Sequence, residues 1–242
     1  MAEQLTLKGC LRSAARTPPF SWFNNQEVFQ LLMLGLEGAG KTTLLYRLKI
    51  GIGGWKKTEI IRNMAFLKDI KDGGGCRDPA YHYEELYGNH IGWYGIWEIP
   101  GNEVMMNMWP MFYRYLRMTA VVFVVDAFSP KKEDYERIGL ARQQLHFLLN
   151  ENELRVAAFV LILNSGSPEG AKKEEDVEFE EALEEMLGVP EIVAANPHHL
   201  RFLKFSINCS EVTRESQEWE EVLKGIHKIY NQTGEGSALG AG

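Results

Sequence analysis

The sequence predicts an α/β fold with a mainly parallel central sheet and helices on both of its faces. Two observations support this fold class. Apolar runs of strand length alternate along the chain with longer segments of helical periodicity, which is the order of β-α-β units. A glycine-rich octapeptide, residues 35–42, also lies directly between the first strand and the first helix. With 242 residues, the chain is long enough for one domain with additions.

The first strand and the first helix flank the octapeptide closely. Residues 28–34, VFQLLML, form an apolar run that is typical of a strand buried on both faces of a parallel sheet. After the octapeptide, Leu44, Leu45 and Leu48 recur at helical spacing, and the pattern ends before Gly51. The order of strand, glycine-rich loop and helix is therefore predicted for residues 28–50.

The remaining elements continue this alternation. Short apolar runs predict buried strands at residues 91–99, 120–125, 158–163 and 203–207. Helical periodicity predicts helices at residues 103–116, 134–149, 174–187 and 215–230. Strands that alternate with helices in this way form parallel sheets through right-handed crossovers. One domain over residues 26–231 is therefore predicted.

Three segments are predicted to lie outside this minimal pattern. Residues 1–25 are interpreted as an N-terminal extension, because Thr17-Pro18-Pro19 interrupts any helix; a docking segment and a disordered tail both remain open. Residues 71–90 contain Gly73-Gly74-Gly75 and three tyrosines, and are interpreted as a long loop inserted between two strands. Residues 232–242 are small and glycine-rich, which predicts a flexible C-terminal tail.

Composition excludes several classes of function. The net charge of −7 argues against a nucleic-acid partner. The three cysteines are odd in number and far apart, which favours a reducing compartment over zinc or disulfides. No transmembrane segment is expected, since no apolar run reaches about 18 residues, and Ala2 excludes N-myristoylation. We expect a soluble intracellular protein, cytoplasmic or organellar; Lys8, Arg12 and Arg16 leave a mitochondrial address open.

The octapeptide G-x-x-x-x-G-K-T has the chemistry of a phosphate-binding loop. Gly35 and Gly40 allow the backbone to curl so that consecutive N–H groups converge on phosphate oxygens. The following helix adds the positive end of its dipole. The lysine reaches terminal phosphates as a point charge, and the Thr42 hydroxyl is a ligand for Mg²⁺. The predicted phosphate-binding residues are Glu37, Gly38, Ala39, Gly40, Lys41, Thr42 and Thr43.

Residues 35–51, GLEGAGKTTLLYRLKIG, resemble the start of ADP-ribosylation factor (Arf) and Arf-like GTPases. The resemblance covers about residues 22–230 and is also strong in residues 121–127, VVFVVDA. It implies a P-loop NTPase G domain that binds GTP or GDP with Mg²⁺ and works through protein partners. Binding of ATP, or of no nucleotide, stays open as an alternative.

In the family, a W-D-V-G-G-Q segment follows the phosphate loop at the end of a strand. The similar segment here is residues 97–102, WEIPGN. The resemblance implies that the backbone N–H of Gly101 senses the γ-phosphate. It also places Glu98 where the family has an Asp that holds the Mg²⁺ shell. The resemblance therefore implies a metal site at Thr42 and Glu98.

Two further positions of this segment differ from the family. Asn102 stands in place of the Gln that orients the attacking water, and a displacement of about 1 Å in a positioning group can cost about 10²-fold in rate. Pro100 fixes its own φ and lacks an N–H, which stiffens the segment. The family's switch I threonine has two candidates, Thr58 and Asn63. We therefore assign no catalytic residue and expect no efficient intrinsic GTP hydrolysis.

The base-binding positions have also changed. Residues 163–167, LNSGS, end a predicted strand where the family has A-N-K-x-D. Asn164 is retained, but Ser167 stands where an Asp accepts two hydrogen bonds from guanine, each worth about 1.5–3 kcal/mol. Cys209 and Ser210 resemble the family's T-C-A segment, in which Ser210 would offer a backbone N–H to the base. Lower guanine affinity and specificity are therefore expected.

These features favour one of three functions. The substitutions, the insertion and the two tails favour a pseudo-GTPase, catalytically weak or inactive, that serves as a structural or docking subunit of a multi-subunit complex. The intact phosphate loop also fits a nucleotide-switching Arf-like GTPase that recruits effectors. An ATP-using phosphotransferase would not need an Asp at position 167, but the framing of the loop argues against it.

Overall fold

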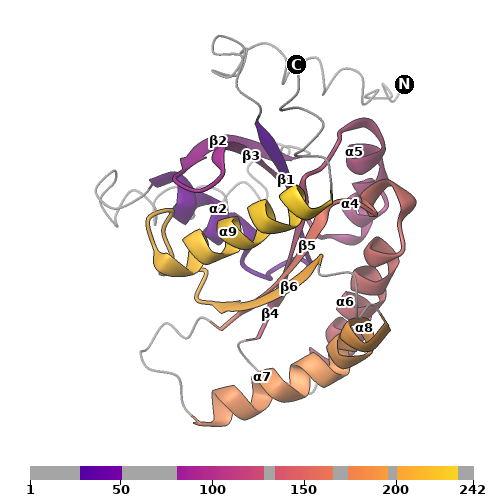
Figure 1. The fold of residues 1–242 in the computed structure, drawn as a ribbon. Coiled ribbons are helices and arrows are strands. Elements are labelled where there is room, and N and C mark those ends of the chain that lie inside the picture. The colour runs from indigo at the N-terminus through magenta and orange to yellow at the C-terminus, as the bar shows by residue number, and fades with distance from the viewer. Residues whose placement is uncertain (1–27, 51–80, 128–133, 166–173, 196–200, 234–242) are drawn as a thin grey trace, which may run out of the picture.

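The computed structural model describes residues 28–50, 81–127, 134–165, 174–195 and 201–233. Within them the centre is a six-stranded sheet with the strand order β2-β3-β1-β4-β5-β6 (Figure 1). The strands are β1 (Phe29–Leu34), β2 (His82–Gly88), β3 (Gly92–Glu98), β4 (Ala120–Asp126), β5 (Ala158–Asn164) and β6 (Phe202–Ile207). Every neighbouring pair is parallel except β2 and β3, which form an antiparallel hairpin at one edge.

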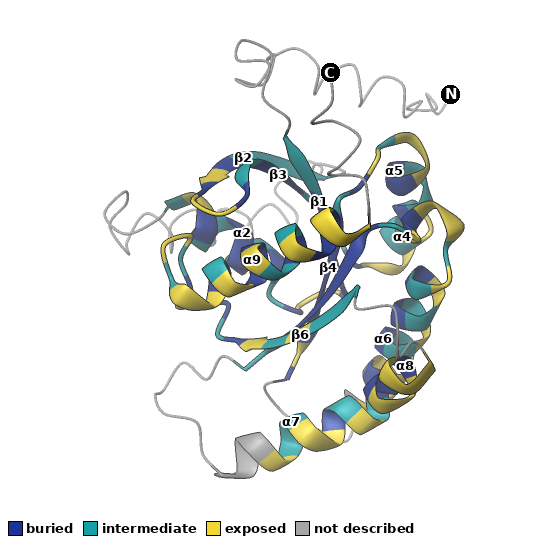
Figure 2. Cartoon of the chain, viewed as in Figure 1, coloured by how far each residue is buried: buried dark blue, intermediate teal, exposed yellow. Residues whose placement is uncertain are grey.

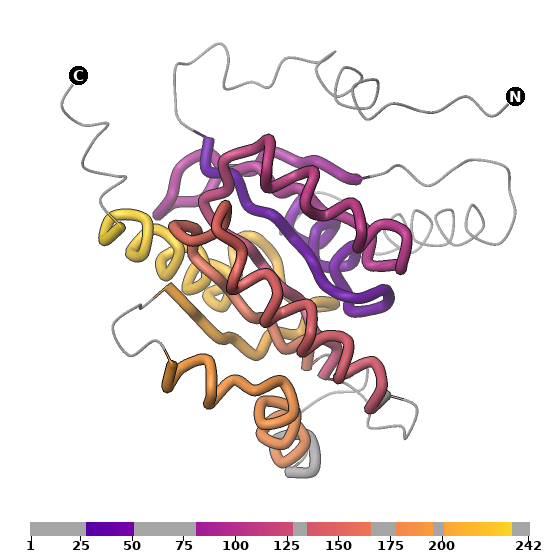
Figure 3. Tube along the Cα trace, turned by 90° about the vertical axis from the view of Figure 1, so that its right-hand side faces the viewer, coloured from indigo at the N-terminus to yellow at the C-terminus, as the bar shows by residue number. Residues whose placement is uncertain are grey.

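Helices cover both faces of this sheet, as Figures 1 and 3 show. One face carries α2 (Lys41–Ile50) and α9 (Gln217–Gln232). The other carries α4 (Glu103–Met106), α5 (Trp109–Tyr115), α6 (Asp134–Leu149), α7 (Glu174–Leu187) and α8 (Val189–Ala195), with the 3₁₀ turn η2 (Asn152–Leu154) between α6 and β5. The predicted fold class, a mainly parallel sheet with helices on both faces, is confirmed.

The central strands explain why two helical layers are needed. Successive side chains of a strand point to opposite faces of a sheet. Leu31 and Met33 of β1 therefore pack against α2 and α9, whereas Leu32 and Leu34 pack against α5 and α6. All four side chains are fully buried, and Figure 2 shows the same burial along β4. A strand buried on both faces has a continuous apolar sequence, which is why these strands were predictable.

The prediction of one continuous helix at residues 103–116 is wrong, because the structure has two helices there, α4 and α5. Pro110 lies in the first turn of α5. A proline has no N–H to donate and its ring clashes with the carbonyl four residues earlier, so one continuous helix cannot form here. Proline is tolerated in a first turn, where its N–H would be unpaired in any case.

The interpretation of residues 71–90 as a loop is wrong for residues 82–88, which form β2. This strand pairs with β3 along its whole length, from His82 opposite Glu98 to Gly88 opposite Gly92. Strand propensity depends strongly on context, and an edge strand with two glutamates and a histidine lacks the apolar run of a buried strand. Residues 71–80 lie outside the described residues.

Other predictions fall partly or wholly outside the described residues. These are the N-terminal extension at 1–25, the candidates Thr58 and Asn63, the base-binding candidate Ser167, and the tail beyond Thr233. Gln232, the first residue of the predicted tail, is the last residue of α9. Where the chain is described, no helix is long and apolar enough to span a bilayer.

Candidate functional site

The glycine-rich loop connects the carboxyl end of β1 to α2. β1 lies between β3 and β4, so the chain leaves the sheet where the strand order reverses, which is where open α/β sheets bind ligands. Gly35 and Gly40 have φ values of 141° and 99°. A Cβ on Gly35 would lie 2.2 Å from the Val124 carbonyl oxygen, and one on Gly40 would lie 2.5 Å from the Asn164 amide nitrogen. Only glycine fits both positions.

The side chain of Lys41 is held underneath this loop. Its Nζ donates hydrogen bonds to the carbonyl oxygens of Gly35, at 2.8 Å, and Leu36, at 2.9 Å. The residue is 4% exposed. Burial lowers the pKa of the Lys41 ammonium to about 8, and the carboxylates of Glu98 and Glu37 oppose that shift. The loop therefore holds its lysine in position through its own backbone carbonyl groups.

This lowered pKa predicts a pH dependence of nucleotide affinity. In the folded, ligand-free protein the ammonium loses its proton near pH 8, whereas in the unfolded chain it does so near 10.5. Only the charged form attracts phosphate, so GDP affinity is expected to fall about 10-fold from pH 7 to pH 9, and about 5-fold of that fall should come between pH 8 and pH 9. Ligand-free stability is expected to rise between pH 8 and 10.5, because the unfolded chain then binds more protons.

Titrations with GDP at pH 7, 8 and 9 check this expectation. The matched comparison is Lys41→Met, which keeps the aliphatic stem and removes the titrating group. A parallel fall of affinity in both proteins would contradict a role for Lys41.

The hydroxyl of Thr42 meets the buried carboxylate of Glu98. Thr42 Oγ1 donates to Glu98 Oε1 at 3.0 Å, from the start of α2 to the end of β3. His82 Nδ1 lies 2.6 Å from the other carboxylate oxygen, Oε2. Glu98 is 2% exposed. The two residues predicted as a metal site are therefore brought together, and their hydroxyl and carboxylate oxygens are ligands that Mg²⁺ prefers.

The predicted phosphate sensor and water-positioning residue lie next to the loop but make different contacts. The Gly101 carbonyl oxygen accepts a hydrogen bond from the Glu37 N–H at 3.2 Å. A Cβ on Gly101 would lie 2.0 Å from the Gly35 carbonyl oxygen. Asn102 is the N-cap of α4, and its Oδ1 accepts from the Met105 N–H at 3.0 Å. The Asn102 side chain therefore serves the helix that follows it.

Asn164 links the phosphate loop to the ends of β5 and β6. Its amide nitrogen donates to the Ala39 carbonyl oxygen at 3.1 Å, and its Oδ1 accepts from the Cys209 N–H at 3.1 Å. The Ser210 N–H donates to Asn208 Oδ1 at 3.0 Å. The structure therefore brings Asn164 and Cys209 together beside the loop, with Ser210 in the same turn.

Two residues of this region were not predicted from the sequence. His82 lies in the segment interpreted as a loop, so nothing placed it near Glu98. Arg137 of α6 donates from Nη2 to the Glu37 carbonyl oxygen at 2.5 Å. No sequence signal identified Arg137, because it is 100 positions from its partner.

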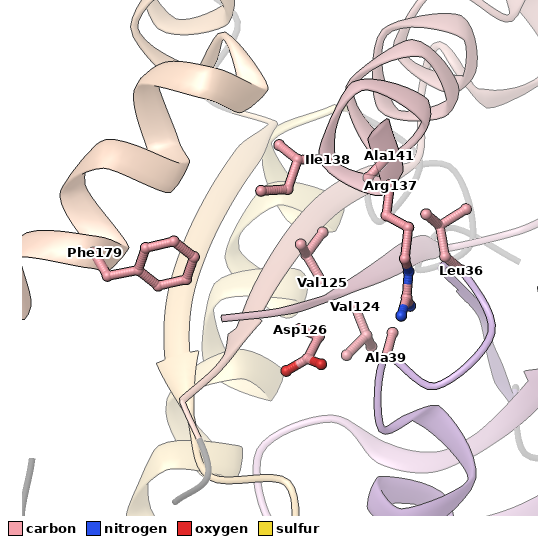
Figure 4. Close-up of a pocket in the computed structure, with 9 residues that line it drawn as sticks. All are labelled: Leu36, Ala39, Val124, Val125, Asp126, Arg137, Ile138, Ala141 and Phe179. Carbon is pink, nitrogen blue, oxygen red and sulfur yellow. The ribbon is translucent and has the colours of Figure 1, made fainter. Parts of the chain in front are cut away.

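A pocket adjoins the other side of the loop (Figure 4). Its walls come from the loop, β4, α6 and α7, and are formed by Leu36, Ala39, Val124, Val125, Asp126, Arg137, Ile138, Ala141 and Phe179. Ala39 is shared with the predicted phosphate ligands, whereas Lys41, Thr42 and Glu98 are not part of this lining. The pocket therefore neighbours the predicted phosphate ligands but does not include the lysine or the Thr42–Glu98 pair.

The position of the loop in the sheet, with a buried lysine and a hydroxyl–carboxylate pair beside it, defines a P-loop protein of the small-GTPase fold. The family model of the ADP-ribosylation factor family matches residues 20–59 and 80–226. The chain belongs to this family, as a divergent Arf-like small GTPase.

Individual relatives agree with this assignment. ADP-ribosylation factor-like protein 1 of Saccharomyces cerevisiae is 33% identical over 165 residues, which span 68% of this chain and 75% of that protein. ADP-ribosylation factor 3 of Arabidopsis thaliana is 30% identical over 164 residues, 68% of this chain and 74% of its own length. The Arl6 small GTPase of Trypanosoma brucei, solved with the bound nucleotide analogue GppNp, is similar in fold, with a TM-score of 0.50. Its sequence is 17% identical, and the match covers 88% of this chain and 98% of the Arl6 chain.

Proposed function

We propose that this chain is an Arf-like guanine-nucleotide-binding protein that retains its nucleotide, hydrolyses GTP slowly or not at all, and serves as a structural or docking subunit of a larger assembly. The observation that carries this proposal is the use of Asn102 as a helix cap. Its Oδ1 lies 3.0 Å from the Met105 N–H, so the atom that would orient a water molecule is already engaged. Releasing an N-cap costs about 1 kcal/mol.

The contacts of the two residues before Asn102, Pro100 and Gly101, also argue against a mobile switch segment. Trp109, which is 1% exposed, donates from its indole N–H to the Pro100 carbonyl oxygen at 3.1 Å. The Gly101 carbonyl oxygen accepts from the phosphate loop itself. A nucleotide-driven rearrangement of residues 100–102 would have to break these contacts together, and proline removes one of the backbone freedoms such a movement uses. This supports a docking role over a switching role.

The nucleotide-binding part of the proposal rests on the loop. Arf-family GTPases bind GTP or GDP with Mg²⁺, and we expect Lys41 and the N–H groups of the loop to hold the phosphates here. Thr42 and Glu98 would hold Mg²⁺, which neutralises charge on the phosphate oxygens when it is bound. Asn164 and Cys209 border the side of the loop where the family resemblance places the base. The proposed docking role also requires protein partners, which would form the larger assembly with this chain.

Asn102→Ala tests the capping role directly. We expect the free energy of unfolding to fall by about 1 kcal/mol, because the first turn of α4 loses its side-chain acceptor. GTP turnover should stay unchanged, because the side chain contributes little to hydrolysis. Urea denaturation and a single-turnover GTP assay measure the two quantities. A 10-fold or larger loss of turnover with unchanged stability would show, on the order-of-magnitude scale used for positioning groups, that Asn102 acts in hydrolysis.

The proposal as a whole is tested on purified full-length protein. The protein is denatured, the released nucleotide is identified by chromatography, and GTP turnover is measured separately. Unassisted small GTPases turn over at about 10⁻⁴ s⁻¹, and a misplaced positioning group costs about 10²-fold; we therefore expect turnover below about 10⁻⁵ s⁻¹. Released guanine nucleotide is expected.

The intact loop and the Thr42–Glu98 pair also fit the alternative, a switching GTPase that recruits effectors. Turnover at about 1 s⁻¹ in the presence of a partner, which is typical of an activated GTPase, would replace our proposal with that alternative. Released ATP would instead favour a phosphotransferase.

A further inference from the structure

Both oxygens of the Glu98 carboxylate are engaged, each by a different side chain. Oε1 accepts from the Thr42 hydroxyl of α2 at 3.0 Å, and Oε2 lies 2.6 Å from Nδ1 of His82 on β2. The pairing of β2 with β3 sets His82 directly opposite Glu98. The imidazole ring also contacts the ring of Tyr46 on α2, with centroids 6.4 Å apart. His82 is thus held between the carboxylate and the helix that carries Thr42.

The directions of these hydrogen bonds determine what the cluster can bind. A carboxylate only accepts, so Thr42 Oγ1 and His82 Nδ1 both donate to Glu98. With its proton directed at Glu98, the Thr42 oxygen keeps its lone pairs for a cation. In this arrangement Thr42 and Glu98 can therefore face the same cation without competing for one proton.

A glutamate needs more support in this position than the family's aspartate. It has one more methylene, and hence one more rotatable bond to fix before its carboxylate can meet Thr42. With only the hydrogen bond from Thr42 to Oε1, the carboxylate group could still rotate and move Oε2. The contact between His82 and Oε2 prevents this rotation.

We propose that His82 is a positioning residue of the divalent-cation site, which fixes Glu98 through Oε2 so that Oε1 and Thr42 present their oxygens to Mg²⁺. This inference rests on the nucleotide site of the proposed function. His82 does not touch the cation in this arrangement; it acts through Glu98. Residues that orient metal-binding side chains in this way typically change metal affinity by about 10–100-fold when they are removed.

The test measures how much Mg²⁺ is needed to slow release of a fluorescent GDP analogue from the full chain. His82→Ala is expected to raise the half-maximal Mg²⁺ concentration about 10-fold. His82→Asn places an amide N–H where Nδ1 was, and should stay within about 2-fold of the original protein. The matched control is His227→Ala on α9, a histidine whose described contacts are the His90 carbonyl oxygen and the ring of Phe29; it should leave the Mg²⁺ requirement unchanged.

A double-mutant cycle separates action through Glu98 from a structural role of the edge strand. In a Glu98→Gln background the further change His82→Ala should shift the Mg²⁺ requirement by less than about 2-fold, because the carboxylate it positions is gone. The inference is overturned if His82→Ala lowers only the unfolding temperature, if the two effects add independently, or if the unmodified protein shows no Mg²⁺ dependence.

The outcome is separable from that of the proposed function. Rapid GTP turnover together with a shifted Mg²⁺ requirement would reject the docking proposal and leave the role of His82 intact. Slow GTP turnover together with an unshifted Mg²⁺ requirement in His82→Ala would support the docking proposal and reject the role of His82.

Discussion

Lys41→Met is expected to weaken binding of GDP and GTP by at least about 100-fold, since hydrogen bonds from a charged group contribute about 1.5–3 kcal/mol each and the ammonium reaches more than one phosphate oxygen. The carbonyl oxygens of Gly35 and Leu36 fix the position of the Lys41 ammonium beneath the loop. The methionine keeps the buried aliphatic stem, so the loss should come from the charge. Calorimetric titration of nucleotide-free protein measures it, and the rise in unfolding temperature on adding GDP should disappear.

The matched control is Lys49→Met in the same helix. Lys49 is 45% exposed and pairs with Glu84 at the surface, and surface pairs contribute little, about 0–1 kcal/mol. Nucleotide affinity should therefore remain within about 2-fold of the original. Equal losses in both variants would mean that the helix as a whole, and not its buried lysine, governs binding.

The sequence predicted the interior of this fold better than its edge. β4, with the sequence AVVFVVD, is buried along six of its seven positions, and such a run has one plausible place in an α/β protein. β2 gave no comparable signal, because four of its seven residues are only partly buried and the strand includes charged groups. The division between α4 and α5 was predictable in principle from Pro110, whose missing N–H limits it to a first turn. The helical periodicity predicted for residues 103–116 concealed this signal.

The site divides in the same way between local and distant contacts. Gly35, Gly40, Lys41 and Thr42 were predictable because their roles follow from spacing within eight residues. The contacts that brace them come from far along the chain. Asn164 is 125 positions from Ala39, and Arg137 is 100 positions from Glu37. A single sequence carries no information about such pairs, which is also why His82 was missed.

The contacts that hold the loop would explain how the proposed retention of a nucleotide is compatible with the proposed loss of switching. Asn164 holds Ala39, Arg137 holds the Glu37 carbonyl oxygen, and Gly101 accepts from the Glu37 N–H. Each contact reaches the loop from a different part of the fold. Under the proposed function, a loop fixed in this way would still hold phosphates, and its neighbours would gain no freedom when a phosphate leaves.

Gly101→Ala tests the contact between Gly101 and the loop. A Cβ at position 101 would lie 2.0 Å from the Gly35 carbonyl oxygen and 2.6 Å from the Leu36 carbonyl carbon. Both are backbone atoms, so the loop itself must move. Forcing extra atoms into a packed region costs about 1–3 kcal/mol and more where backbone must shift, so we expect a loss of about 3 kcal/mol of stability. GDP affinity should fall at least about 10-fold as the N–H groups lose their alignment.

Gly139→Ala is the control for this substitution, because a Cβ on Gly139 meets nothing within 4 Å and the residue lies in the interior of α6. Alanine forms helix more readily than glycine, so this variant should be more stable by about 0.5–1 kcal/mol. Urea denaturation and GDP titration of both variants give the comparison. If the two alanine variants bind GDP equally well, Gly101 does not hold the phosphate loop, and segment 100–102 has more freedom to switch than we propose.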